Sequence, residues 1–95
     1  MREEIAVRLR GDIDHHSVKR LKESLDKLIE TKRPRRLVLD FESVSLTDSS
    51  GIGLVIGRYK TMRSQGGELF LKNVGRQTDA VFKVAGVYRI IKKIS

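Results

Sequence analysis

A strand, a loop and a helix follow one another within residues 36–65, which read RLVLDFESVSLTDSSGIGLVIGRYKTMRSQ. Apolar and more polar side chains alternate over residues 36–41, and this period of two predicts a β-strand with one face in the core. We expect a loop over residues 42–48. A helix is predicted from Ser49 to about Gln65, because apolar side chains recur along one side of it.

The same two periodicities recur along the rest of the chain. They predict further strands at residues 5–10, 68–72 and 89–94, and further helices at residues 18–33 and 77–85. Asp14 stands where its carboxylate can cap the first helix, and Pro34 prevents that helix from continuing. Strands that alternate with helices in this way imply a parallel sheet with right-handed connections.

One face of each of the first three strands is apolar, whereas the other face is mostly charged. We therefore expect an α/β fold with an open, mainly parallel four-stranded sheet, a (βα)n superhelix whose helices pack mainly on one face. The face without helices would carry Arg8, Arg10, Arg36, Asp40, Glu68 and Lys72, with Val38 and Phe70 as apolar exceptions.

Length and composition limit the classes of protein to consider. The 95 residues, 39% of them hydrophobic, suffice for a single domain over residues 1–95. The chain has no cysteine, which excludes disulfides, a thiolate nucleophile and cysteine-based metal sites. No apolar window is long enough for a membrane span, and no signal peptide is recognisable, so we expect a cytoplasmic protein without membrane partners.

The net charge of +8 invites a nucleic-acid interpretation. Only five aromatic residues are present, three Phe and two Tyr, and most lie in or beside apolar runs. A base-stacking surface is therefore poorly supported, and the scattered basic residues fit a solvated surface. We expect no nucleic-acid partner.

The start of the second predicted helix carries the chemistry of interest. Ser49 falls at its N-cap, where a serine hydroxyl ordinarily accepts backbone amides of the first turn, near Gly51. Gly53 and Gly57 lie on one helix face at a cost of about 1 kcal/mol each against alanine, and close helix packing is the ordinary reason. A more specific interpretation is phosphorylation of Ser49, because free amides and the helix dipole would favour a phosphate there.

Two segments, GDIDHHS at residues 11–17 and TDSSGIGLVIGRYK at residues 47–60, resemble the STAS domain of anti-sigma factor antagonists, the sporulation antagonists above all. The resemblance extends from about Ile5 to Ile94. It implies a non-enzymatic binding module without cofactor or metal. In this family the unmodified antagonist binds an anti-sigma factor that is also a serine kinase.

The resemblance also implies a switch and a set of site residues. The kinase phosphorylates the serine that follows the motif aspartate, which weakens binding, and a serine phosphatase reverses the modification. That serine corresponds to Ser49. The implied partner-binding residues are Asp12, Asp14, His15, Asp48, Ser49, Ser50, Gly51 and Gly53.

Three other interpretations remain open. A hydrolase could pair Ser49 with His15 or His16, but the serine lacks the G-x-S-x-G elbow. A nucleotide or phosphate site could use Gly51 and Gly53, although the pattern departs from G-x-G-x-x-G. A stability-optimised or designed scaffold of the same fold, without a retained partner, would also fit the charge-rich composition.

Overall fold

The computed structural model describes residues 3–95, which form four strands, three α-helices and one short 3-10 helix. In chain order the elements are β1 (Glu4–Ile13), α1 (Val18–Lys32), β2 (Arg36–Thr47), α2 (Ser50–Ser64), β3 (Glu68–Lys72), α3 (Arg76–Val84), η1 (Val87–Arg89) and β4 (Lys92–Ile94). Among these described residues, no helix combines the length and the apolar character needed to cross a membrane.

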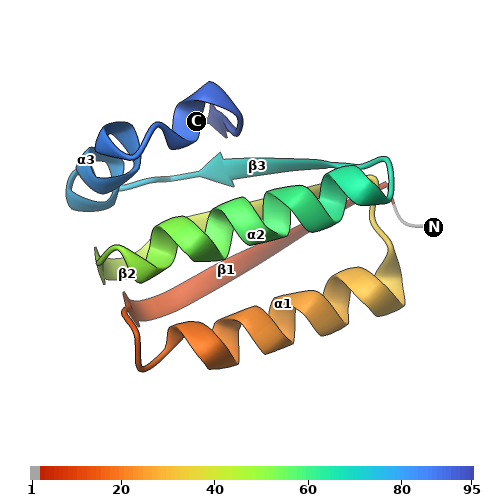
Figure 1. Cartoon of the computed structure of the whole chain (residues 1–95), viewed down its shortest axis with the longest axis horizontal. Coiled ribbons are helices and arrows are strands. Elements are labelled where there is room, and N and C mark those ends of the chain that lie inside the picture. Colours follow the sequence, from red (N-terminus) through yellow and green to blue (C-terminus); the bar gives the residue numbers. More distant parts are fainter. Residues whose placement is uncertain (1–2) are drawn as a thin grey trace.

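The sheet is parallel throughout, with the strand order β1-β2-β3-β4, as the alternating pattern predicted. Right-handed crossovers that always step in the same direction place their helices on the same side of a sheet. Accordingly, α1 and α2 both lie in front of the strands in Figure 1. The core between the two layers contains Leu9, Ile13, Leu25, Ile29, Leu37, Leu39, Phe41, Leu54, Val55, Met62, Leu69, Leu71, Phe82, Val87 and Ile91.

The opposite face of the sheet is charged, as predicted, and some of its charges, such as those of Arg8 and Asp40, are paired across strands. Arg8 lies opposite Asp40 in the register and approaches its carboxylate at 3.4 Å. Asn73 donates a hydrogen bond to the same carboxylate at 3.0 Å. Hydrogen bonds from the Glu42 amide and from Asn73 hold the pKa of Asp40 below its ordinary value. Val38 lies beside Phe70 on this face and is buried without a covering helix.

The predicted loop over residues 42–48 is wrong, because β2 continues to Thr47. Its partner β1 also continues past Gly11, which adopts a positive φ of 75°, as far as Ile13. The two strands stay paired through two register shifts in which β2 gains an extra residue. Such bulges interrupt the period of two, so the pattern in the sequence fades where the strand persists.

The predicted strand over residues 89–94 is only partly right, because β4 is confined to Lys92–Ile94. Gly86, at a φ of 75°, turns the chain out of α3 and into η1. The carbonyl of Val87 then accepts the amides of Ile90 and Ile91 at 3.1 and 3.0 Å. These local bonds take up the amides that a longer strand would have used.

A buried charge connects the two long helices. The side chain of Arg58, on α2, is only 5% exposed. Its guanidinium Nε lies 2.9 Å from the carboxylate of Asp26 on α1. Removal of one member of such a pair leaves an uncompensated charge inside the protein. The pair therefore ties the middle of α2 to the middle of α1.

Asp79 on α3 anchors the C-terminal segment. Its carboxylate accepts hydrogen bonds from the Tyr88 hydroxyl at 2.6 Å and the Lys93 ammonium at 2.9 Å, and Lys83 lies 3.1 Å away. These donors, Tyr88 first, hold the pKa of Asp79 far below its ordinary 3.8. Three segments, α3, η1 and β4, are thereby joined at one carboxylate.

We predict that Asp79→Asn lowers the free energy of unfolding at pH 7 by about 1.5–3 kcal/mol, the scale of a hydrogen bond to a charged group. A carboxyl group whose pKa is lowered by folding stabilises the protein above its ordinary pKa of 3.8, and this contribution disappears as the pH falls below it. The difference between wild type and variant should therefore shrink in acid. Urea unfolding at pH 7 and at low pH measures it.

Glu23→Gln is the matched control, because Glu23 is an exposed carboxylate on α1. It should change stability by little at either pH. A deficit of Asp79→Asn that stays constant as the pH falls would contradict the role assigned to the ionised carboxylate.

Candidate functional site

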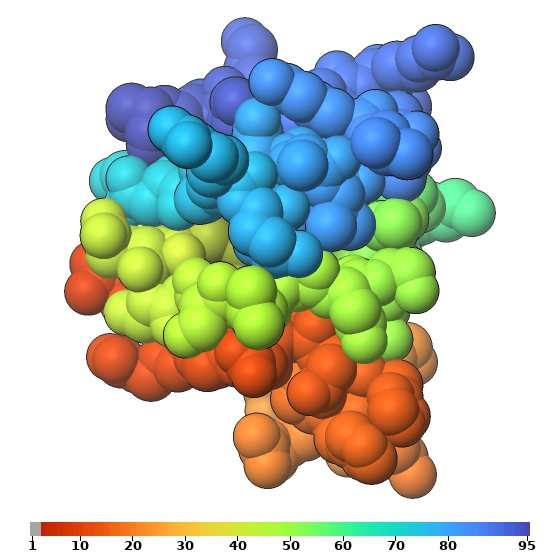
Figure 2. Space-filling model, turned by 90° about the vertical axis from the view of Figure 1, so that its left-hand side faces the viewer, coloured from red at the N-terminus to blue at the C-terminus, as the bar shows by residue number. Residues whose placement is uncertain are grey.

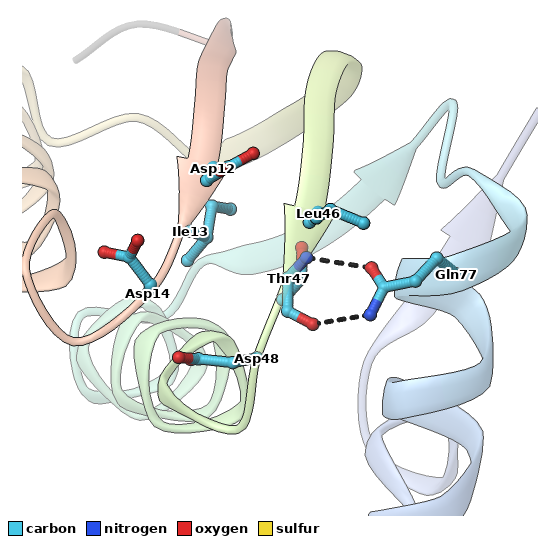
Figure 3. A pocket seen from close by; sticks show the side chains of 7 residues that line it. All are labelled: Asp12, Ile13, Asp14, Leu46, Thr47, Asp48 and Gln77. Atoms are coloured by element: carbon cyan, nitrogen blue, oxygen red, sulfur yellow. Dashed lines mark hydrogen bonds between the residues drawn. The ribbon is translucent and has the colours of Figure 1, made fainter.

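The loop after β1 and the start of α2 meet at the carboxyl edge of the sheet. Ile13 pairs with Thr47 in the last step of the register, so the segments that follow the two strands leave the sheet side by side. A pocket of about 270 Å³ lies between them, as Figure 3 shows. It is lined by Asp12, Ile13, Asp14, Leu46, Thr47, Asp48 and Gln77.

The first turn of α2 is closed by Asp48 rather than by Ser49. The Asp48 carboxylate accepts the amide of Ser50 at 2.7 Å, and its carbonyl accepts the amide of Gly51 at 3.0 Å. The amide of Ile52 donates to the Ser49 carbonyl at 3.1 Å. The predicted capping role of the Ser49 hydroxyl is therefore wrong, because the carbonyls of Asp48 and Ser49 already accept the amides of Gly51 and Ile52.

Ser49 is consequently a solvent-exposed serine at the end of a helix. No group among residues 3–95 forms a hydrogen bond with the Ser49 hydroxyl, and this holds for His15 and His16 as well. The amides of residues 50–52, which the sequence predicted to be free for a phosphate, are already bonded within the chain. A phosphate on Ser49 would meet the field of the helix dipole but would compete with Asp48 for the Ser50 amide.

Asp14 organises the turn before α1 rather than capping the helix itself as predicted, because α1 begins at Val18 with Ser17 at its N-cap position. Its carboxylate accepts the amides of His16 and Ser17, each at 2.9 Å. The Ser17 hydroxyl returns a hydrogen bond to the Asp12 carbonyl at 2.8 Å. The bond from the Ser17 amide, above all, lowers the pKa of Asp14. This closed set of bonds holds the loop in one conformation beside α2.

The predicted site residues of the loop after β1 and of the start of α2 lie near one another at this edge of the sheet. His15 and His16 are exposed, and their rings lie 3.9 Å apart. Figure 3 shows Asp14 and Asp48 on the two segments that leave the sheet at this edge, with Asp14 in the loop after β1 and Asp48 at the start of α2. Within residues 3–95, no three histidine or carboxylate side chains converge in a way that could hold a metal ion.

The glycines of α2 differ in what surrounds them. Gly51 is buried, and a Cβ there would clash with the methyl group of Thr47 and touch Ile13 and Phe82. Gly53 and Gly57, in contrast, face open space, so the helix-packing reason predicted for them is wrong. Since glycine inside a helix costs about 1 kcal/mol against alanine, these two positions weaken α2 without any gain in packing.

Three residues at or beside the site, Leu46, Gln77 and Thr78, were not singled out in the sequence analysis. The side-chain amide of Gln77, on α3, donates to the carbonyl of Thr47 and accepts its amide, both at 2.8 Å. The Thr47 hydroxyl shares a 2.8 Å hydrogen bond with Thr78. Leu46 is 56% exposed beside the pocket. A strand assigned through Thr47 would have shown that Leu46 and Thr47 point to opposite faces of the sheet.

Comparison with known proteins agrees with the fold described above. The family model described as "STAS domain" matches residues 2–95. The chain belongs to the STAS domain family. Two relatives carry the names "Anti-sigma-B factor antagonist", from Bacillus subtilis, and "Anti-sigma F factor antagonist", from Paenibacillus polymyxa. The first is 35% identical over 93% of this chain and 79% of its own, and the second is 30% identical over 92% and 74%.

Solved structures of STAS proteins have the same fold. The anti-sigma factor antagonist SpoIIAA in its unphosphorylated form superposes with a TM-score of 0.84 and 29% identity, over all of this chain and 83% of that one. The phosphorylated form of SpoIIAA superposes with a TM-score of 0.74 over all of this chain and 86% of that one. The STAS fold thus includes a protein whose structure is known with and without a phosphate.

We predict opposite effects of two substitutions on this helix. Gly51→Ala should lower the free energy of unfolding by about 1–3 kcal/mol, because its Cβ would have to displace Thr47. Gly53→Ala should raise it by up to about 1 kcal/mol, because the added methyl group meets nothing and alanine favours the helix. Urea unfolding of both variants measures the difference, and equal effects would contradict the close approach of α2 to β2.

Proposed function

We propose that this chain is an anti-sigma factor antagonist whose partner-binding surface is the start of α2 with the Asp12–Ser17 loop, and that phosphorylation of Ser49 switches binding off. The exposed, unbonded hydroxyl of Ser49 beside the Asp48 carboxylate carries the proposal. The names of the relatives, which are regulatory binding proteins rather than enzymes, support this class of function. The kinase is expected to be the anti-sigma factor itself, and a serine phosphatase would restore the unmodified form.

Electrostatics explain how one phosphate could act as a switch. The site already carries the carboxylates of Asp12, Asp14 and Asp48 within a chain of net charge +8. A phosphoserine adds about −1.5 to −2 charges at pH 7. A partner that accepts the unmodified surface would then meet a much denser negative charge, together with the bulk of the phosphate, at its point of contact.

The fold tolerates this added charge because Ser49 points away from the core. Gly51, two residues later, is the position that packs against Thr47 and Ile13. The phosphate would therefore change the surface and leave the packing beneath it unaltered. Such a separation is what a reversible switch on a folded domain needs.

The open glycines of α2 are consistent with a docking helix. Gly53 lies on the exposed side of α2, and nothing within the described residues 3–95 approaches the open side of Gly57. The exposed Leu46 adds apolar surface at the rim of the pocket. A partner could therefore approach the helix backbone closely here, which accounts for glycines that the fold itself does not require.

We predict that an anti-sigma factor kinase with ATP phosphorylates the chain on Ser49 and nowhere else. The probe is the purified anti-sigma-B factor of Bacillus subtilis, used after it is shown to phosphorylate its own antagonist, and tandem mass spectrometry locates the phosphate. Ser49→Ala should abolish the modification, whereas Ser50→Ala should retain it. Phosphate on Ser50, or none with the active kinase, would contradict the assignment.

A cytoplasmic location belongs to this proposal, since the kinase requires ATP in the same compartment.

Binding is tested separately from modification. Ser49→Asp should weaken binding to the same anti-sigma factor roughly tenfold, because an aspartate supplies part of the phosphate's charge. Ser64→Asp adds the same charge at the exposed far end of α2 and serves as the matched control, with affinity unchanged. Titration calorimetry gives both affinities. Equal weakening by the two variants would indicate a non-specific charge effect and would overturn the proposed surface.

A further inference from the structure

The outer edge of β1 is open, and it lies apart from the start of α2. The strand order places β1 at one side of the sheet, and within residues 3–95 no strand pairs with its outer edge. The carbonyls of Glu3 and Ile13 accept amides from the β2 side at 2.9 and 3.0 Å. Because backbone direction alternates along a strand, the polar groups of even-numbered residues such as Ala6 and Arg10 point outward.

A groove runs beside this edge, between β1 and α1. Its volume is about 260 Å³, and it is lined by Val7, Arg8, Leu9, Arg10, Arg20, Leu21, Ser24 and Leu25. In Figure 2, β1 borders the molecule at the lower left and α1 forms a ledge beside it. The apolar side chains of the groove come from the helix-covered face of β1 and from the inner side of α1.

The rim of the groove is strongly basic. Arg8 shares its charge with Asp40, but its side chain is still 50% exposed. Arg10 and Arg20 are exposed, and neither forms an ion pair with any residue of the described range 3–95. An open strand edge, an apolar groove and unpaired arginines therefore coincide along one side of the domain.

We propose that this edge binds an extended acidic segment of another protein, which adds to the sheet as a fifth strand beside β1. Side chains of an added strand alternate between the two faces of the sheet. One set would enter the groove against Val7 and Leu21, and the other set would face Arg8 and Arg10. The segment that fits this edge thus alternates apolar residues with aspartate or glutamate.

A second copy of this chain is a poorer occupant. An antiparallel pair of two β1 strands would bring Arg8 and Arg10 of one copy close to the same residues of the other. Like charges opposite one another destabilise a strand pair. Charge complementarity therefore favours an acidic partner over self-association.

The test uses a fluorescently labelled ten-residue peptide of alternating valine and glutamate, with anisotropy as the readout. A valine–lysine peptide of the same length and a valine–glutamate peptide with alternate N-methylated amides are the comparison probes. We expect the valine–glutamate peptide to bind one to one, and at least about tenfold more tightly than either comparison probe. Binding by the N-methylated peptide with equal affinity would overturn strand addition, since its backbone cannot donate the required hydrogen bonds.

Variants of the protein locate the site. Arg10→Glu combined with Arg20→Glu should reverse the preference toward the valine–lysine peptide. Lys60→Glu combined with Arg89→Glu changes the net charge equally at exposed positions elsewhere and should leave the preference unchanged. Ala6→Pro, which removes an outward amide from the edge, should also abolish binding. Loss of preference in the control variant, or a dimer in sedimentation experiments that Ala6→Pro dissociates, would overturn the proposal.

Discussion

The absence of a side chain at Gly51 allows α2 to begin directly against the end of β2. Any Cβ at this position would occupy the space of the Thr47 methyl group. Thr47 in turn is fixed by Gln77 and Thr78 on α3, so one close approach joins the central strand to two helices. Because Gly51 faces inward, Ser49 is turned outward at the same helix end, and the switch position is a consequence of the packing beneath it.

Much of the fold could be predicted because its periodicities are regular. The parallel sheet, the helices on one face and the charged opposite face all follow from alternation in the strands and from amphipathic helices. The extension of β2 to Thr47 could not be predicted in the same way, since two bulges break its alternation. The shortened β4 reflects a local competition, in which the Val87 carbonyl takes amides that the sequence pattern assigned to a strand.

At the site, contacts between residues close in sequence could be predicted, whereas contacts between distant residues could not. Asp14, Asp48 and Ser49 lie in short segments whose neighbours are close in sequence, and the structure brings all three to one edge. The contacts of Gln77 with Thr47 span 30 residues, so no local sequence pattern predicts them. The exchange of capping roles between Ser49 and Asp48 depends on backbone angles at one residue, which residue types alone do not determine. The structure thereby leaves the Ser49 hydroxyl free, although the sequence predicted that it would be engaged.

The central claim is that a phosphate on Ser49 changes what the surface binds and leaves the core unchanged. The most direct measurement compares the unmodified and the Ser49-phosphorylated chain in two readouts, affinity for an anti-sigma factor and amide chemical shifts by NMR. The account predicts that phosphorylation abolishes or strongly weakens binding, with shifts confined to the Asp12–Ser17 loop and the first turns of α2. Equal affinity of the two forms, or shifts that spread through β2 and β3, would contradict it.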